Sequence, residues 1–264
     1  MENLIKKLDL NEYITNFSKL FAREKPIILE GDINIHYKII SELSNYNINQ
    51  PSSVQNLDSQ LMHIQKQGIL RVYEIYEFIK IINYFLYLKR FNFEGKLLEW
   101  MDKIVIPNEI LKICEYFDDK ANLKEGVDED FDNIKQAIYK NKEEIKQSLY
   151  KTINSSKIKP YLVDMQVHFI NEQECLLVRG GFNHILSGSV IDRSNSGFFY
   201  VIPHSVSDLK EKQSDLKNKQ EEILFRLCKE ISHIFERNLL FLKFINKEFD
   251  RFDHYQARIF FSKI

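Results

Sequence analysis

The stretch ECLLVRGGFNHILSGSVIDRSNSGFFYVIP, Glu174 to Pro203, decides the fold that the sequence predicts. It contains three short runs of apolar, β-branched and aromatic residues, separated by Gly, Ser and Asn: Cys175–Val178, Gly188–Asp192 and Phe198–Pro203. Runs bounded by such turn-forming residues are typical of antiparallel strands joined by hairpins. Nearly all of the remaining chain has helical periodicity. The sequence therefore predicts one small sheet set between long helices.

A further strand is predicted immediately before this stretch. Apolar side chains occupy the odd-numbered positions from 161 to 169, and mostly polar side chains occupy the even-numbered ones. This alternation indicates a half-buried strand. The sheet is therefore expected to have about four strands within Tyr161 to Pro203.

Helical periodicity dominates the part of the chain before the sheet. The helix predicted from about Arg71 to Arg90 is apolar on most faces, which is typical of a buried helix. We take it as the centre of an N-terminal helical domain. Other helices are predicted from Leu4 to Phe21, after Asp32 as N-cap, after Ser52 or Ser53 as N-cap, and from Pro107.

Seven acidic residues lie between Asp118 and Asp132. A carboxylate cluster could hold a divalent ion, but the spacing is not that of an EF-hand. Acidic residues are also favoured at the start of a helix. We prefer the second interpretation, a solvated loop leading into a helix that ends near Thr152. A metal-dependent enzyme built on these carboxylates is the weakest alternative for function.

After the sheet, three apolar residues recur every seven positions among charged and amide residues: Leu209, Leu216 and Ile223. Such a narrow stripe is typical of a helix packed along a single partner. The partner is either the Val127 to Leu149 helix of the same chain, which we prefer, or a second copy. From Leu224 the stripe widens, so the helix re-enters a core or turns back near Arg237–Asn238.

Charge, cysteine content and hydrophobicity limit the class of protein and its location. With 37 basic and 38 acidic residues among 264, no overall charge indicates a nucleic-acid or membrane partner, so any such partner must be met by local charge. The widely spaced Cys114, Cys175 and Cys228 favour buried free thiols in a reducing compartment. The sequence shows no secretory signal and no apolar run long enough to span a bilayer. A cytoplasmic location is expected.

Motifs of catalysis are missing from the sequence. It contains no Gly-rich phosphate loop, HExxH, GxSxG or paired-cysteine zinc motif. Its seven histidines are scattered without ligand spacing, and Gly180–Gly181 is more typical of a bulge or tight turn than of a dinucleotide site. We therefore expect no enzyme active site, no cofactor and no metal ion in this chain.

The segment from Gly188 to Ile202 resembles a signature of the bacterial MutS-II family, MutS paralogues that lack the mismatch-reading domain. The family pattern is roughly G-I-V-H-D-x-S-x-S-G-x-T-x-F-I-E-P. Seven residues fall on it: Gly188, Val190, Asp192, Ser194, Ser196, Gly197 and Ile202. Cys175–Arg179 looks like the preceding R-Y-V-I-P-V-K segment of the family. Phe252–Asp253 with Ala257–Arg258 is similar to its L-D-x-x-x-A-K.

The sequence departs from the family pattern at Ile191, Phe199 and Pro203–His204, which replace His, Thr and Glu-Pro. No family role is carried over to these positions. The resemblance follows the whole chain in element order, although its specific motifs occupy only about Glu174 to Ile202 and the last dozen residues.

The resemblance implies a mainly α fold with a small antiparallel β subdomain. In this arrangement a helical core leads into long lever helices, with a β clamp at their tip. The expected divisions are a core at 1–117, a lever helix at 118–156, a clamp at 157–203 and a returning lever at 204–264. The ATPase and C-terminal Smr nuclease domains of the family, with ATP and magnesium, are not expected within this stretch. The chain would then be an N-terminal region.

By the same resemblance, we expect this chain to act as a nucleic-acid clamp in a homodimeric, ATP-driven protein. The target would be branched DNA, in DNA repair and suppression of recombination, or collided ribosomes through rRNA, in ribosome quality control. Phosphate attraction would carry such binding. The candidate residues are Lys157, Lys159, Arg179, His184, Arg193, Lys210 and Lys212. The alternative from another class is a helical protein-interaction or dimerisation module without nucleic-acid contact.

Overall fold

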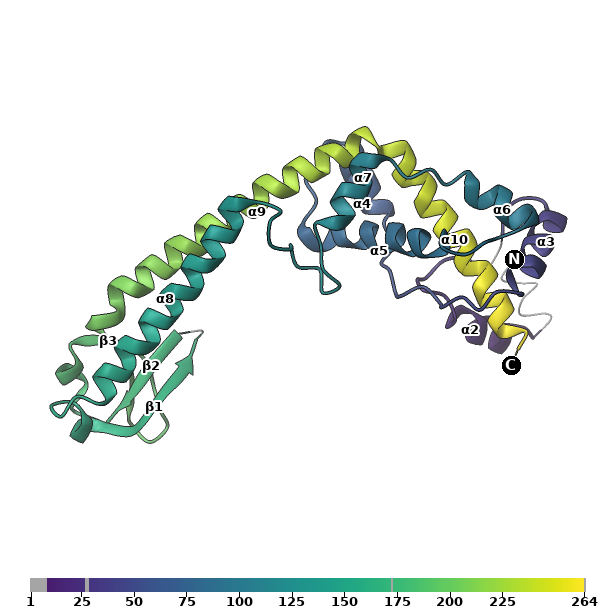
Figure 1. The fold of residues 1–264 in the computed structure, drawn as a ribbon. Coiled ribbons are helices and arrows are strands. Elements are labelled where there is room, and N and C mark those ends of the chain that lie inside the picture. The colour runs from purple at the N-terminus through teal and green to yellow at the C-terminus, as the bar shows by residue number, and fades with distance from the viewer. Residues whose placement is uncertain (1–8, 27–28, 172, 264) are drawn as a thin grey trace. The chain divides into compact units, whose positions relative to one another are not determined.

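The structure is a computed structural model that describes residues 9–26, 29–171 and 173–263 (Figure 1). The chain forms two compact units. The helical unit comprises Met1–Lys124 and Phe225–Ile264, and the sheet unit comprises Glu125–Leu224. Helix α9, Ser207–Arg237, begins in the sheet unit and ends in the helical unit. The described fold is mainly α with a four-stranded antiparallel sheet, as the sequence predicts.

The helical unit is organised around α5 (Val72–Leu88), whose inward side chains pack without solvent contact. Seven of its residues are buried, which confirms the prediction of a central buried helix. Trp100 stacks on Phe252 of α10 (Leu239–Phe261), with ring centroids 5.9 Å apart. The described helices besides α9 are α2 (Asn11–Ser18), α3 (Ile33–Leu43), α4 (Asp58–Gln65), α5 (Val72–Leu88), α6 (Gly95–Asp102), α7 (Asn108–Glu115) and α10 (Leu239–Phe261).

Two helix starts agree with the predicted caps. Asp32 caps α3, since its carboxylate accepts a hydrogen bond from the Asn34 N–H at 2.8 Å. Pro107 directly precedes α7. The chain also turns where predicted, because α9 ends at Arg237 and α10 begins at Leu239.

One predicted cap is wrong, one helix was not predicted, and one predicted helix lies partly outside the described residues. Ser52 and Ser53 do not cap α4, which begins at Asp58, because the Val54 N–H bonds instead to the Ala22 carbonyl oxygen. Helix α6 was not predicted, although its buried Leu97, Trp100 and Met101 have helical spacing. The first predicted helix is described only from Asn11 to Ser18, and its residues Leu4, Ile5 and Leu8 lie outside the described residues.

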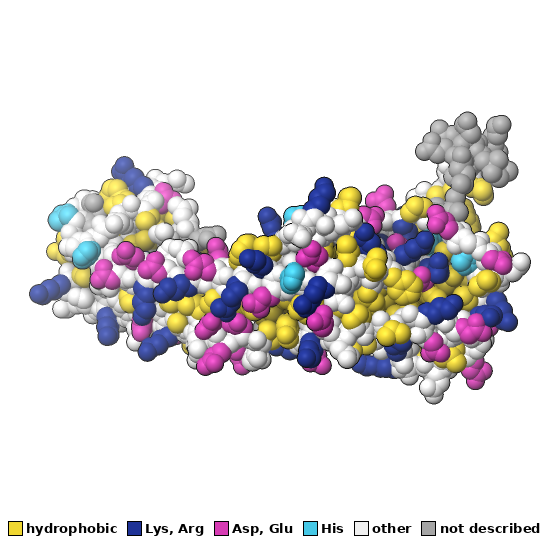
Figure 2. Space-filling model, turned by 90° about the horizontal axis from the view of Figure 1, so that it is seen from above, with side chains coloured by type: hydrophobic (Ala, Val, Ile, Leu, Met, Phe, Trp, Pro, Cys, Tyr) yellow, Lys and Arg dark blue, Asp and Glu magenta, His cyan; other side chains and the backbone are white. Residues whose placement is uncertain are grey.

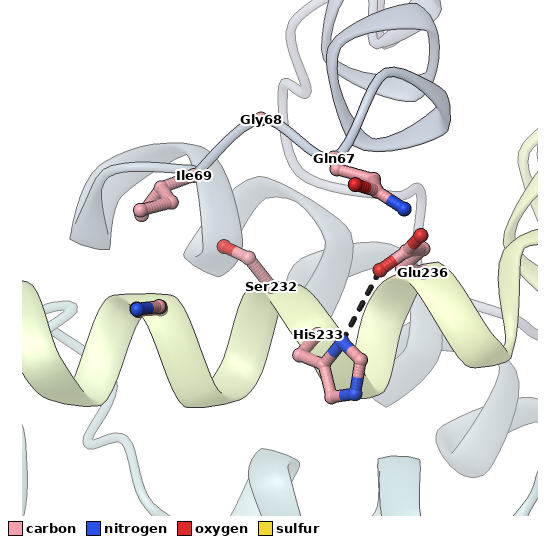
Figure 3. Close-up of a pocket in the computed structure, with 7 residues that line it drawn as sticks. Gln67, Gly68, Ile69, Ser232, His233 and Glu236 are labelled. Carbon is pink, nitrogen blue, oxygen red and sulfur yellow. Dashed lines mark hydrogen bonds and ion pairs between the residues drawn. The ribbon is translucent and has the colours of Figure 1, made fainter.

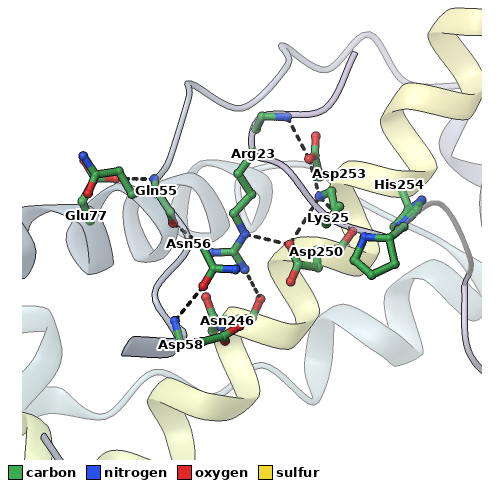
Figure 4. Close-up of polar contacts among 12 residues, drawn as sticks. Arg23, Lys25, Gln55, Asn56, Asp58, Glu77, Asn246, Asp250, Asp253 and His254 are labelled. Carbon is green, nitrogen blue, oxygen red and sulfur yellow. Dashed lines mark hydrogen bonds and ion pairs between the residues drawn. The ribbon is translucent and has the colours of Figure 1, made fainter. Parts of the chain in front are cut away.

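A network of buried charges ties the segment after α2 to α10 (Figure 4). Arg23 donates to the Asp250 carboxylate at 2.8 Å and to the Asn246 carbonyl oxygen at 3.0 Å. Lys25 forms an ion pair with Asp253, which also accepts from the Ala22 N–H at 2.9 Å. Burial lowers the pKa of Lys25 and raises that of Asp253, so each charge depends on the other. Asp253, from the L-D-x-x-x-A-K-like motif, thus has a structural role.

The sheet unit contains α8 (Glu129–Ile153), the first part of α9 and four strands. The strands are β1 (Leu162–Ile170), β2 (Gln173–Val178), β3 (Gly188–Arg193) and β4 (Phe199–Pro203). Short 3-10 helices precede β1, β3 and α9: η1 (Lys159–Tyr161), η2 (Asn183–Leu186) and η3 (His204–Val206). Helix α8 and the strands share one hydrophobic core, in which Ile145, Leu149 and Ile153 meet Leu176, Val178 and Val201.

The strand order is β1-β2-β4-β3, so the connection from β2 to β3 is not a hairpin. The prediction that hairpins join all of these strands is therefore wrong at this connection. Residues 179–187, including η2, carry the chain across, and β4 then inserts between β2 and β3. As a central strand, β2 has four buried residues in succession, Cys175–Val178. Its continuous apolar run reflects burial on both faces.

The alternation predicted for β1 is interrupted. Leu162 and Val167 both pack on the core although they lie five positions apart, whereas strict alternation would place them on opposite faces. The pairing of β1 with β2 shifts register between these two residues, which indicates a bulge. Phe169, which alternation would place on the same face as Val167, is nevertheless 66% exposed, and the bulge, which precedes Val167, does not explain this.

The residues that carry the family resemblance build the β3–β4 hairpin. The Ser194 hydroxyl accepts from the Phe198 N–H at 3.0 Å, and the Ser194 carbonyl oxygen accepts from the Gly197 N–H at 2.9 Å. Gly197 has φ +80°, which glycine adopts without strain. At Gly188 any side chain would collide with the Ile202 carbonyl oxygen on β4. These positions of the motif are thus explained by backbone geometry.

We predict that Gly188→Ala destabilises the protein by about 1–3 kcal/mol, because the new methyl group must push β3 away from β4. Urea unfolding followed by circular dichroism measures this loss. Ser189→Ala, at the exposed neighbouring position, serves as the control and should leave the midpoint nearly unchanged. Equal midpoints for Gly188→Ala and the wild type would contradict the close backbone approach.

A second prediction concerns His254, which donates from Nε2 to the Pro26 carbonyl oxygen at 2.8 Å when its ring is neutral. Burial, with the positive charge of Lys25, lowers the pKa of His254 from 6.5 to about 4. The unfolded chain therefore takes up this proton first as pH falls. His254 should contribute fully to stability above about pH 6.5 and lose up to about 3 kcal/mol between pH 6.5 and 4.

The test compares wild type and His254→Gln by urea unfolding at several pH values, followed by Trp100 fluorescence. Trp100 is the single tryptophan and lies in the helical unit, so it reports on the same core. The variant should show a flatter dependence of stability on pH in this window. Identical slopes would show that His254 does not titrate between the folded and unfolded states as predicted.

Candidate nucleic-acid interface

Strand register brings four of the predicted cations to one end of the sheet. Leu162 pairs with Val178, and Val178 and Arg193 both pair with Phe199. The start of β1, the ends of β2 and β3, and the start of β4 therefore lie at the same end. We call it the cationic end, after four residues located there: Lys157, Lys159, Arg179 and Arg193.

Two of these cations precede β1. Lys157 lies in the turn after α8, and Lys159 opens η1. The turn is held by the Ser155 carbonyl oxygen, which accepts from the N–H groups of Ile158 and Lys159 at 3.0 and 2.9 Å. Both lysines are exposed, and within the described part of the chain neither ammonium group has an acidic partner.

The two arginines are held in place by the sheet. The Arg179 N–H donates to the Tyr161 carbonyl oxygen at 3.0 Å, and its Nε donates to the Leu162 carbonyl oxygen at 3.2 Å. The guanidinium carbon of Arg193 lies 5.2 Å from the centre of the Phe199 ring. Both side chains are exposed and, among the described residues, neither guanidinium is paired with a carboxylate. They therefore present oriented positive charge to solvent.

The remaining predicted residues are placed differently. Lys210 is largely buried and forms an ion pair with Glu174, near the opposite end of the sheet. Lys212 on α9 is exposed and lies 3.5 Å from the Glu144 carboxylate of α8. His184 is exposed on η2, in the connection between β2 and β3. The structure thus groups four of the seven predicted residues and leaves three elsewhere.

Charge is mixed on one face of the molecule. On the face shown in Figure 2, Lys and Arg side chains are interspersed with Asp and Glu. This agrees with the net charge of −1. A site for an anion must therefore depend on local groups of unpaired cations, and the cationic end is such a group.

Sequence reasoning missed two aromatic residues at the cationic end. The rings of Tyr161 and Phe182 lie 5.0 Å apart between centroids, and Phe182 is 41% exposed. The available signal was the succession Arg179-Gly180-Gly181-Phe182, in which an arginine and an aromatic residue flank two glycines. Their proximity to Tyr161 depends on strand pairing, which that succession does not show.

The heptad residues of α9 begin within the core of the sheet unit. Leu209 packs against that core, and its carbonyl oxygen accepts from the Asn141 side chain of α8 at 3.1 Å. Leu216 and Ile223 are half-buried. At Leu209 the stripe therefore packs within the chain, as the preferred interpretation expected.

A pocket of the helical unit lies between the loop Gln67–Ile69 and α9 (Figure 3). The Ser232 hydroxyl accepts from the Leu70 N–H at 2.9 Å, whereas the imidazole of His233 pairs with Glu236 at 3.2 Å. In Figure 3 Ser232 points toward the loop and His233 points away from it. Serine and histidine in this pocket therefore do not form a nucleophile and base pair.

Further observations concern metal ligands, the acidic residues before and within α8, the cysteines and membrane-spanning helices. Among the described residues, no group of three or more His, Cys, Asp or Glu is arranged to hold a metal ion. The acidic residues Glu129, Asp130 and Asp132 lie in the first turn of α8. All three cysteines are buried and free, as predicted, and burial raises the pKa of Cys114 to about 12. No described helix combines the length and apolarity required to cross a membrane.

Comparison with known proteins finds two that are similar in sequence to this chain. It is 33% identical to a protein named Endonuclease MutS2 from Helicobacter pylori strain 26695, and 32% identical to the protein of that name from strain J99. Each alignment covers 98% of this chain and 35% of the relative. The chain thus spans about a third of the length of the curated relatives it matches. No protein-family model matches it.

This similarity extends along nearly the whole chain, beyond the short motifs of the β3–β4 hairpin and α10. The same motifs have defined structural roles in both units, at Gly188, Ser194 and Gly197 and at Asp253. Along nearly its whole length the chain is therefore similar to proteins named Endonuclease MutS2, in agreement with the resemblance of its sequence to the MutS-II family.

Proposed function

We propose that the cationic end of the sheet binds the phosphates of nucleic acid, and that this chain is the non-catalytic clamp and lever region of a MutS-II protein. The observation that supports this proposal is the convergence of four exposed cations without acidic partners among the described residues. Neighbouring strands lie about 4.8 Å apart, so the two edge strands, β1 and β3, are separated by about 14 Å. The four cations are distributed over this distance. That distance spans several phosphates of a duplex.

The proposal extends to the whole protein. The relatives carry the name endonuclease, so this chain would position nucleic acid for chemistry performed elsewhere in a homodimer. The glycine pair Gly180–Gly181 does not have the geometry of a phosphate loop, because it closes a turn followed by a four-residue 3-10 helix, without the helix N-terminus that such a loop requires. ATP and magnesium would be bound outside this stretch. The setting would be cytoplasmic.

Two targets have the required phosphate chemistry. Branched DNA would place the protein in DNA repair and suppression of recombination. Ribosomal RNA of collided ribosomes would place it in ribosome quality control. Both targets have closely spaced phosphates and bends, so the cationic end alone does not rank them, and the experiment includes both nucleic acids.

The test is fluorescence anisotropy of the 264-residue chain with a four-way DNA junction, a matched duplex and an RNA hairpin, over a salt series. Four phosphate contacts predict that affinity falls about 100-fold between 50 and 200 mM salt. The variant Lys157→Glu/Lys159→Glu/Arg193→Glu should abolish binding. Its control, Lys66→Glu/Lys103→Glu/Lys120→Glu, makes the same charge change at exposed lysines of the helical unit.

Equal losses in both triple variants would show that only overall charge matters, which would contradict a site at the cationic end. Absence of binding by the wild type to all three nucleic acids would overturn the proposal for this chain. Preference for the junction or the hairpin would choose between the two targets.

A separate prediction concerns Lys210, whose ion pair with Glu174 is largely shielded from solvent. Lys210→Ala should lower the free energy of unfolding by about 1–2 kcal/mol, because the Glu174 carboxylate loses its partner. Its affinity for nucleic acid should not change. Lys212→Ala removes a lysine of α9 that is 54% exposed and serves as the control, with little effect on stability. Loss of binding without loss of stability in Lys210→Ala would instead assign Lys210 to the interface.

A further inference from the structure

An aromatic pair lies among the cations of the sheet end. Phe182 and Tyr161 are inclined by 38°, with ring centroids 5.0 Å apart, and Phe182 is 41% exposed. Tyr161 ends η1, two residues after Lys159, and Phe182 follows Arg179 by three. The exposed ring therefore lies beside groups suited to phosphate.

Backbone hydrogen bonds hold the ring in this place. The Phe182 N–H donates to the Arg179 carbonyl oxygen at 3.2 Å, which closes a four-residue turn. Gly181, at the third position of the turn, has φ +83°, the conformation that favours glycine there. The Arg179 N–H in turn donates to the Tyr161 carbonyl oxygen at 3.0 Å. One short segment thus positions the guanidinium and both rings together.

The space around the turn is also limited on one side. A side chain at Gly180 would lie 3.2 Å from the Gly197 carbonyl oxygen, so this turn and the β3–β4 turn lie close together. A side chain at Gly181 would meet nothing within 4 Å. Glycine at 181 is required by backbone conformation alone, and it leaves open space next to the exposed ring.

An exposed aromatic ring beside cations is suited to a particular form of nucleic acid. Bases stack on aromatic side chains while their phosphates contact lysine and arginine, but only when the bases are unpaired and accessible. Bases within a duplex are already stacked and offer no face. An exposed ring at the cationic end is therefore suited to unpaired bases and not to the bases of a duplex.

We propose that Phe182, supported by Tyr161, stacks on an unpaired base whose flanking phosphates contact Arg179 and Lys159. The ligand is a DNA or RNA strand with unpaired nucleotides, such as a gap, a branch point or a loop. The inference rests on the proposed function, since the same cations supply the phosphate contacts. It adds a preference for unpaired bases that those cations alone do not provide.

The matched control is available on the same sheet. Phe169 on β1 is 66% exposed, more than Phe182, but lies near the opposite end, where Ile170 pairs with Gln173. If Phe182 served only to cover Tyr161, Phe182→Ala would lower the affinity for nucleic acid no more than Phe169→Ala does. The two phenylalanine variants therefore separate a binding role from a loss of apolar surface.

The experiment titrates the whole chain against a continuous duplex, the same duplex with a short gap, and the gap strand alone as DNA and as RNA. The unpaired segment contains 2-aminopurine, whose fluorescence is quenched when an aromatic ring stacks on it. The wild type should bind the gapped duplex more tightly than the continuous one and quench the probe. Phe182→Ala should weaken gapped-duplex binding by about 5-fold or more and lose the quenching.

Two further variants and two possible negative results decide the inference. Phe182→Trp should restore both affinity and quenching, and Phe169→Ala should behave as the wild type. If all variants bind gapped and continuous duplex equally well, the stacking inference is wrong and the phosphate-binding function stands. If the wild type binds no nucleic acid, both are wrong. The DNA and RNA strands compare the two sources of unpaired nucleotides.

Discussion

The pairing of β2 with β4 is the interaction on which the cationic end of the sheet depends. Val178 lies opposite Phe199, and Phe199 lies opposite Arg193 across the next pair of strands. This register places the residues after β2 beside the hairpin that joins β3 to β4. The core formed with α8 buries Leu176, Val178 and Val201, so a shift of register would expose apolar side chains to water. Burial thereby determines where the cations lie.

The two units stabilise their chain segments by different means. In the sheet unit, apolar side chains of α8 pack against those of β2 and β4. The ion pair of Lys210 with Glu174 in this unit is partly exposed to solvent. In the helical unit, α10 carries a buried network in which Asp253 neutralises Lys25. Removing one partner of such a pair is more costly than removing both, because it leaves a buried charge alone. The segment after α2 is thus tied to the C-terminal helix.

Five of the seven hairpin residues shared with the MutS-II pattern fall into two groups. Gly188, Ser194 and Gly197 are explained by close backbone approach and turn geometry. Asp192 and Ser196 are exposed at the same hairpin, next to Arg193. The first group builds the hairpin, and the second lies on the surface where the proposed ligand would bind. Phe182 belongs to neither group.

From the sequence alone, the local features of this protein were determined: a buried α5, the Asp32 cap, the strands and the turn between α9 and α10. These depend on periodicity and on residues close together in the chain. Strand order, the bulge of β1 and the start of α4 were decided by tertiary structure, because distant backbone groups compete for hydrogen bonds, as Ala22 does for Val54. The separation of Lys210 from the cationic end, and the meeting of Tyr161 with Phe182, had the same origin. Strand pairing joins residues far apart in sequence, and no local pattern records which strands pair.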